Sequence, residues 1–152
     1  MFIVNWLRLE HQRETLIDGN INPLWKALLD ALDETMLAFN ELYRVDKTKL
    51  EVNGLGPRVR FYFKLPQHGP ANSAPPVKYA EALIAYDGSA RAVVATFKES
   101  RAKPVSLLVD ALISADGTAE LFLCDDQGQR IADVDKASRL LLESFLQELK
   151  DA

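Results

Sequence analysis

The chain has 152 residues, of which 48% are hydrophobic and 26% charged, a composition typical of a globular domain and unlike that of a disordered segment. Its length suits one compact unit, so we expect a single α+β domain over residues 1–152. The net charge of −4 argues against a nucleic-acid partner, because phosphate binding depends on clustered Lys and Arg.

Cysteine content and hydropathy indicate the compartment. The chain has one cysteine, Cys124, which excludes an intramolecular disulfide and suits a reducing environment. The first residues lack the basic and then apolar order of a signal peptide. No apolar run approaches the roughly 20 residues that a membrane-spanning helix needs. We therefore expect a cytoplasmic protein that does not bind membranes.

The first residues fit two interpretations. Phe2, Ile3, Trp6 and Leu9 suit an amphipathic helix, whereas alternation in the same stretch suits a strand. A short helix is favoured, and residues 18–20 (Asp-Gly-Asn) are expected to end it.

A long helix is predicted to begin at Asn22 and Pro23. Asn can cap a helix, and proline is well tolerated at the first helical position, where its missing N–H is not needed. Apolar residues then recur at steps of four and three: Trp25, Leu29, Leu32, Met36, Phe39 and Tyr43. Such a broad stripe predicts a helix packed against a sheet, with Trp25 in the core.

From residue 50 the period changes to two. Val59, Phe61, Phe63 and Leu65 alternate with polar or aromatic residues, which predicts a half-buried strand joined to an earlier one by a turn at 53–57. Residues 66–76 contain four prolines and are expected to form an exposed loop.

Residues 78–86 are predicted to form a strand that ends at Asp87-Gly88, and two interpretations compete for residues 89–101. The Asp-Gly pair and the β-branched residues favour a hairpin strand. The helical spacing of Ala90, Val93 and Phe97, with Ser89 as a cap, favours a helix slightly more.

The last third of the chain predicts a hairpin and a helix. Residues 105–114 and 118–125 are apolar runs joined by Asp116-Gly117, and their near-continuous hydrophobicity predicts a central, covered position in the sheet. A short strand at 129–132 and a helix from Asp133 or Asp135 to Lys150 follow. The fold expected is an antiparallel sheet of five or six strands with both helices on one face.

Residues suited to catalysis are few. The two histidines, His11 and His68, have no second metal-type ligand beside them. Cys124 lies in an apolar run and is expected to be a small buried side chain. We therefore predict no catalytic residue, metal or cofactor, and lean against an enzyme. An enzyme would need paired carboxylates, such as Asp125 or Asp126 with Glu81 or Glu120.

Binding residues are easier to nominate. Trp6 is the more suitable of the two tryptophans for a surface anchor, because Trp is enriched in binding hot spots. Four aspartates crowd the stretch before the final helix: Asp125, Asp126, Asp133 and Asp135. A turn and a helix cap explain them. They could also form an acidic rim that steers a basic protein partner.

Two motifs carry a family resemblance. Residues 51–54 (Glu-Val-Asn-Gly) precede the strand beginning at Val59, and residues 104–108 (Pro-Val-Ser-Leu-Leu) precede Asp116-Gly117. With the leading amphipathic helix, this order resembles small bacterial immunity proteins of toxin systems. The resemblance implies a non-catalytic protein that binds and neutralises a toxin. The alternative function is a carrier that holds a small apolar ligand in a cavity between sheet and long helix.

Overall fold

The computed structural model describes residues 5–43, 47–53, 58–64 and 79–151, with the backbone alone for 47–53 and Lys64. A long helix, α1 (Asn5–Tyr43), comes first and a second helix, α2 (Val134–Asp151), comes last. Between them lie the strands β1 (Lys47–Asn53), β2 (Arg58–Lys64), β3 (Tyr79–Asp87), β4 (Ala92–Lys98), β5 (Val105–Ile113) and β6 (Ala119–Cys124). The predicted α+β class is confirmed.

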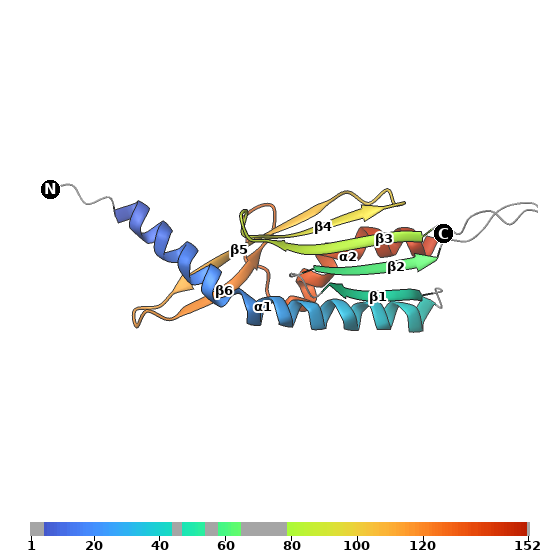
Figure 1. Cartoon of the computed structure of the whole chain (residues 1–152), viewed down its shortest axis with the longest axis horizontal. Helices are drawn as coiled ribbons and strands as arrows, with labels where there is room; N and C mark the ends of the chain where they lie inside the picture. The colour runs from blue at the N-terminus through green and yellow to red at the C-terminus, as the bar shows by residue number, and fades with distance from the viewer. Residues whose placement is uncertain (1–4, 44–46, 54–57, 65–78, 152) are drawn as a thin grey trace, which may run out of the picture.

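The strands form one six-stranded sheet in the order β1-β2-β3-β4-β5-β6. Every neighbouring pair is antiparallel, so the chain winds through the sheet as a simple meander. The β5–β6 connection turns at Gly117, whose φ of 85° favours glycine. Figure 1 shows the sheet curling, with α1 running along one border and α2 behind the strands.

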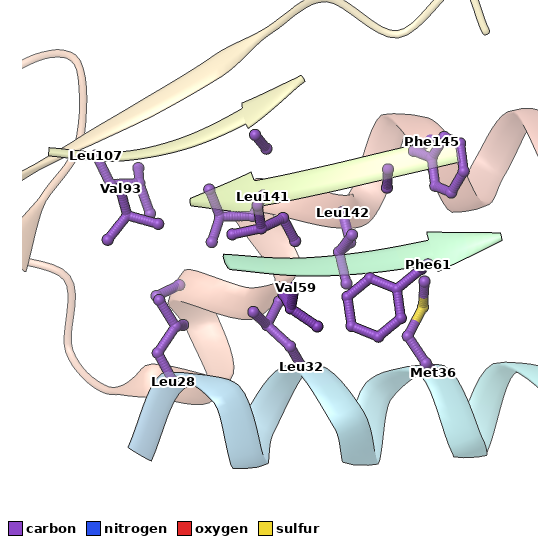
Figure 2. Close-up of a cluster of buried hydrophobic side chains, with 14 of the residues drawn as sticks. Leu28, Leu32, Met36, Val59, Phe61, Val93, Leu107, Leu141, Leu142 and Phe145 are labelled. Carbon is purple, nitrogen blue, oxygen red and sulfur yellow. The ribbon is translucent and has the colours of Figure 1, made fainter. Parts of the chain in front are cut away.

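Both helices cover the same face of the sheet. Side chains alternate along β2 to β6, and the inward set is buried with the helices: Val59, Phe61, Phe63, Ala82, Ile84, Val93, Ala95, Leu107, Val109 and Leu123. Figure 2 shows Leu28, Leu32 and Met36 of α1 pointing toward the strands. Among the described residues, no helix covers the other face of the sheet, in agreement with the prediction of helices on one face.

The long helix departs from the prediction at its start. One continuous helix runs from Asn5, so the expected break at 18–20 and the new start at Asn22-Pro23 are both wrong. Ile17, Ile21, Leu24 and Leu28 continue the inward stripe at steps of four, three and four. Burial of that stripe outweighs the poor helix propensity of glycine and proline. Proline inside a helix commonly bends it, and Figure 1 shows the axis changing direction in the blue part of α1.

Residues 92–98 form strand β4, so the slight preference for a helix over 89–101 is wrong. Ser89 does not cap a helix. Its N–H and its Oγ instead donate hydrogen bonds of 3.0 and 2.7 Å to the Asp87 carboxylate, which closes a turn. Arg91 then adopts a φ of 48° and directs the chain back along β3. Beyond it Val93 and Ala95 face the core in the two-residue period of a strand.

The β5–β6 hairpin is confirmed, but its predicted central position is wrong. β6 is the last strand of the sheet, and Leu108 and Leu112 of β5 are 53% and 59% exposed. The near-continuous hydrophobicity of this hairpin therefore includes apolar side chains on the uncovered face. In place of a strand at 129–132, Arg130 makes a single bridge to Cys124.

The final helix is confirmed at the predicted position. Residues 54–57 of the turn predicted at 53–57 lie outside the described residues, as do Phe2, Ile3, Leu65, the proline-rich stretch at 66–76 and His68. Neither α1 nor α2, as far as the structure describes them, contains a segment both long and apolar enough to cross a bilayer.

Candidate interaction surface

The first turns of α1 expose three large apolar side chains. Trp6, Leu7 and Leu9 are 68%, 52% and 60% exposed. Figure 1 shows these turns projecting at the same end of the molecule as the tip of the β5–β6 hairpin. Apolar groups gathered on a surface are typical of binding sites, and Trp is the residue type most often found at their energetic centre.

This free end is an extension of the buried helix. Within residues 5–24 of α1 only Ile17 is buried, whereas the following part buries Trp25, Leu28 and Leu32 among others. Trp6 precedes Ile17 by 11 residues, about three helical turns, so it lies near the same face of the helix. Between Ile17 and Trp6 this side of the helix carries the charged residues Glu10, Arg13 and Glu14, so the exposed Trp6 is set apart from the buried stripe.

The uncovered face of the sheet adds apolar side chains near this end. Leu108 and Leu112 of β5 are exposed, and Phe122 of β6 is half-buried beneath the Arg130 guanidinium, 4.6 Å from the ring centroid. Arg130 also forms an ion pair with Glu120 at 2.5 Å. The outer side of this hairpin therefore combines apolar side chains with the ion pair of Arg130 and Glu120.

Two of the four nominated aspartates have structural roles. The Asp125 carboxylate accepts hydrogen bonds of 2.9 Å from the N–H groups of Gln127 and Gln129, which fixes the turn after β6. Asp133 accepts one of 2.8 Å from the N–H of Lys136 and so caps α2. The interpretation as a turn and a helix cap is correct for these two residues.

The other two aspartates, Asp126 and Asp135, are exposed. Asp126 and Asp125 line a cavity of about 270 Å³ beside Leu107 and Leu140. Asp135 lies at the rim of a separate groove of about 240 Å³ between α1 and α2. Carboxylates above apolar walls suit a long basic side chain, whose stem is apolar and whose end is charged.

The nominated residues do not form one surface. The four aspartates gather between the end of β6 and the first turn of α2, whereas Trp6 lies at the free end of α1. In Figure 1 that free end stands away from α2. The structure thus divides the aspartates between the turn after β6 and the start of α2, and leaves the tryptophan apart from both.

The residues with catalytic potential are also apart. Cys124 is buried, and burial, followed by the charges of Asp110 and Asp125, raises the pKa of its thiol, which disfavours the reactive thiolate. Asp125 and Asp126 follow β6, whereas Glu81 lies on β3, with β4 and β5 between. The Glu120 carboxylate pairs with Arg130, and that of Asp125 accepts backbone N–H groups of its own turn. His11 is exposed on α1. Within the described residues, no three His, Cys, Asp or Glu side chains are grouped so that they could hold a metal ion.

Comparison with protein-family models, curated proteins and solved structures gave no match to this chain. The fold and its exposed side chains are therefore the basis for a functional proposal.

Sequence reasoning nominated Trp6 but missed Leu7, Leu108 and Leu112. A signal for the two β5 leucines was present, because they alternate with Leu107 and Val109 and share their face with Ser106 and Asp110. Polar residues at those two positions indicate that the face is in contact with water.

Proposed function

We propose that this chain is a non-catalytic protein-binding module that works in the cytoplasm and uses the free end of α1 as its main contact surface. The observation that supports the proposal is the exposure of Trp6, Leu7 and Leu9 on the first turns of one helix. Exposing these three side chains to water without a partner is unfavourable, and covering them would give a partner a compact apolar anchor.

The partner we propose is a basic protein, and an immunity-type role, in which the partner is a toxin, is the most specific form of the proposal. The net charge of −4 favours encounter with a positively charged surface. Asp125, Asp126, Asp133 and Asp135 would steer such a partner, since charges outside the contact mainly raise the rate of association. The resemblance to immunity proteins supports this role and remains a hypothesis.

The carrier alternative has less support. It requires a cavity between the sheet and α1, but Figure 2 shows this space occupied by side chains from both. Leu28, Leu32 and Phe61 are at most 3% exposed there. A ligand would have to displace this packing, which is close to crystal density in protein interiors.

The test is affinity capture from the native host with matched variants. The wild-type chain is compared with Trp6→Ser and Leu9→Ser at the free end, and with Leu42→Ser as the control. Leu42 is 72% exposed near the other end of the same helix, so its substitution makes the same chemical change elsewhere. We expect one protein to be retained by the wild type and Leu42→Ser and lost with Trp6→Ser and Leu9→Ser.

Retention by all four proteins would place the contact away from the free end.

The toxin role has its own test. Co-expression with a candidate toxin encoded beside this chain should restore growth for the wild type and not for Trp6→Ser. Binding without protection would limit the proposal to a binding module of another kind.

A further inference from the structure

The first part of α1 is attached to the sheet differently from the rest. We call residues 5–18 the arm. Within the arm only Ile17 is buried. Farther along α1, Trp25, Leu28, Ala31, Leu32, Met36 and Phe39 are all buried. Regions with few buried apolar contacts open at low free-energy cost, independently of the rest of a protein.

Besides the burial of Ile17, charged contacts hold the arm in place. The Arg91 guanidinium donates two hydrogen bonds to the Asp18 carboxylate, from Nε at 3.0 Å and from Nη2 at 2.8 Å. Its Nη2 also lies 3.8 Å from the Glu14 carboxylate. A second pair joins Arg13 to Asp110 of β5 at 3.6 Å. We call these contacts the latch.

The residue at the centre of the latch is fixed to the sheet. Arg91 ends the β3–β4 turn with a φ of 48°, and its carbonyl accepts a 2.9 Å hydrogen bond from the N–H of Val109. Its backbone is therefore tied to β5 while its side chain reaches α1. This arrangement gives the arm a rigid anchor point on the sheet.

The chain beyond the arm is suited to bending. Gly19 has the greatest backbone freedom, and Pro23 cannot donate the hydrogen bond that the Gly19 carbonyl would otherwise accept. The Asn20 side chain donates to the Leu16 carbonyl at 2.7 Å, a bond that does not replace the missing one. The change of axis direction in Figure 1 lies in this part of α1.

We propose that the latch holds the arm against the sheet and that the arm can leave the sheet. The helix would bend at Gly19 to Pro23, and the rest of the fold would stay intact. This opening of the arm does not require a binding partner. The side chains of the latch are 26% to 50% exposed, so dissolved salt reaches them and weakens the latch. The Debye length falls from about 30 Å at 0.01 M salt to about 3 Å at 1 M.

Hydrogen exchange of the full-length chain, measured by mass spectrometry, tests the proposal. Once it has left the sheet, the arm is a short helix without packing, which is marginal in water and opens its backbone hydrogen bonds. Raising salt from low to high concentration should therefore speed exchange in the arm about three- to tenfold, as loss of a few exposed ion pairs predicts. Peptides from residues 25–39 and from the strands should not change. Asp18→Asn and Arg91→Ala should show fast arm exchange already at low salt, with little further effect of salt.

Two control variants isolate the latch and the hinge. Arg139→Ala removes an exposed ion pair with Glu143 on α2 and should leave the arm unchanged. Gly19→Ala adds a methyl group where no atom lies within 4 Å, so it should stiffen the helix and slow arm exchange about threefold or more.

Three results would overturn the proposal: arm exchange that is insensitive to salt and to Asp18→Asn, faster exchange in all peptides together, or no effect of Gly19→Ala. The first would show that the ion pairs do not hold the arm. The second would show that the arm does not open separately. The third would place the hinge elsewhere.

Discussion

Thr35 and Ser138 join the two helices through a pair of hydroxyl oxygens that lie 2.8 Å apart. The Thr35 hydroxyl donates to the Ala31 carbonyl at 2.7 Å. Its one proton is thereby used, so Ser138 is the donor in the pair. Ser138 is fully buried, and this bond satisfies a polar group that burial has removed from water.

We predict that Ser138→Ala lowers the free energy of unfolding by about 0.5–1.5 kcal/mol, because it removes one hydrogen bond and leaves Thr35 with its bond to Ala31. Ser138→Val should cost more, about 1–3 kcal/mol, since it adds volume to a filled site. Urea unfolding of the two variants and the wild type measures both values. Equal stability of all three would mean that the hydroxyl pair and the close packing contribute nothing.

Glu148 ties α2 to the chain that follows β4. Its carboxylate accepts a 2.5 Å hydrogen bond from Ser100 Oγ, and bonds of 3.0 and 2.8 Å from the N–H of Arg101. The Ser100 hydroxyl, followed by the backbone of Arg101 and Ala102, holds the pKa of Glu148 below its usual value. The ionised form is therefore favoured by folding.

We predict a stability contribution from Glu148 that depends on pH. Because its pKa is lowered in the folded state, the contribution is present above the unfolded pKa of about 4.3. It is lost as the pH falls through the folded value. The difference in unfolding free energy between wild type and Glu148→Gln should thus be larger at about pH 7 than at about pH 3.

The control is Glu143→Gln, the same chemical change on the exposed side of α2, where Glu143 pairs with Arg139. This variant should change the free energy of unfolding by less than about 1 kcal/mol at either pH, because exposed ion pairs contribute little. A pH dependence equal to that of Glu148→Gln would contradict the role given to the Ser100 and Arg101 contacts.

The cap of α2 gives a third prediction. Asp133→Ala removes the hydrogen bond to the N–H of Lys136 and should lower stability by about 1 kcal/mol, whereas Asp133→Asn should largely preserve it. Asp126→Ala, at an exposed residue of the neighbouring turn, should change stability by less than about 0.5 kcal/mol. Thermal unfolding separates these cases. A larger loss for Asp126→Ala than for Asp133→Ala would contradict the capping role.

Much of the fold could be predicted from local patterns. The two-residue alternation predicted β2, the Asp116-Gly117 turn predicted the β5–β6 hairpin, and the apolar stripe predicted α2. These predictions were correct because the residues that each pattern places on one side are the ones that the fold buries. The errors came where local and distant effects disagree. Gly19 and Pro23 are poor helix formers, but burial of Ile17 and Leu28 on either side keeps α1 continuous.

The β4 error and the incomplete surface have a related cause. Val93 and Phe97 have a spacing that would place them on one face of a helix. Pairing of this segment with β3 and β5 makes it a strand instead. The position of β6 at the edge of the sheet depends on which strands lack a further partner. A single chain contains no local pattern for that edge position. The exposure of Leu108 and Leu112 did have a local signal, in Ser106 and Asp110 on the same face of β5.

The central claim is that this protein acts by binding another protein through the free end of α1. Site-specific photo-crosslinking tests it most directly, with benzoylphenylalanine placed at position 6 in one protein and at position 42 in another. We predict that position 6 crosslinks a single protein from the native host, that position 42 does not, and that Trp6→Ala weakens binding of the purified partner about 30-fold or more. Equal crosslinking at both positions, or unchanged affinity of Trp6→Ala, would contradict the claim.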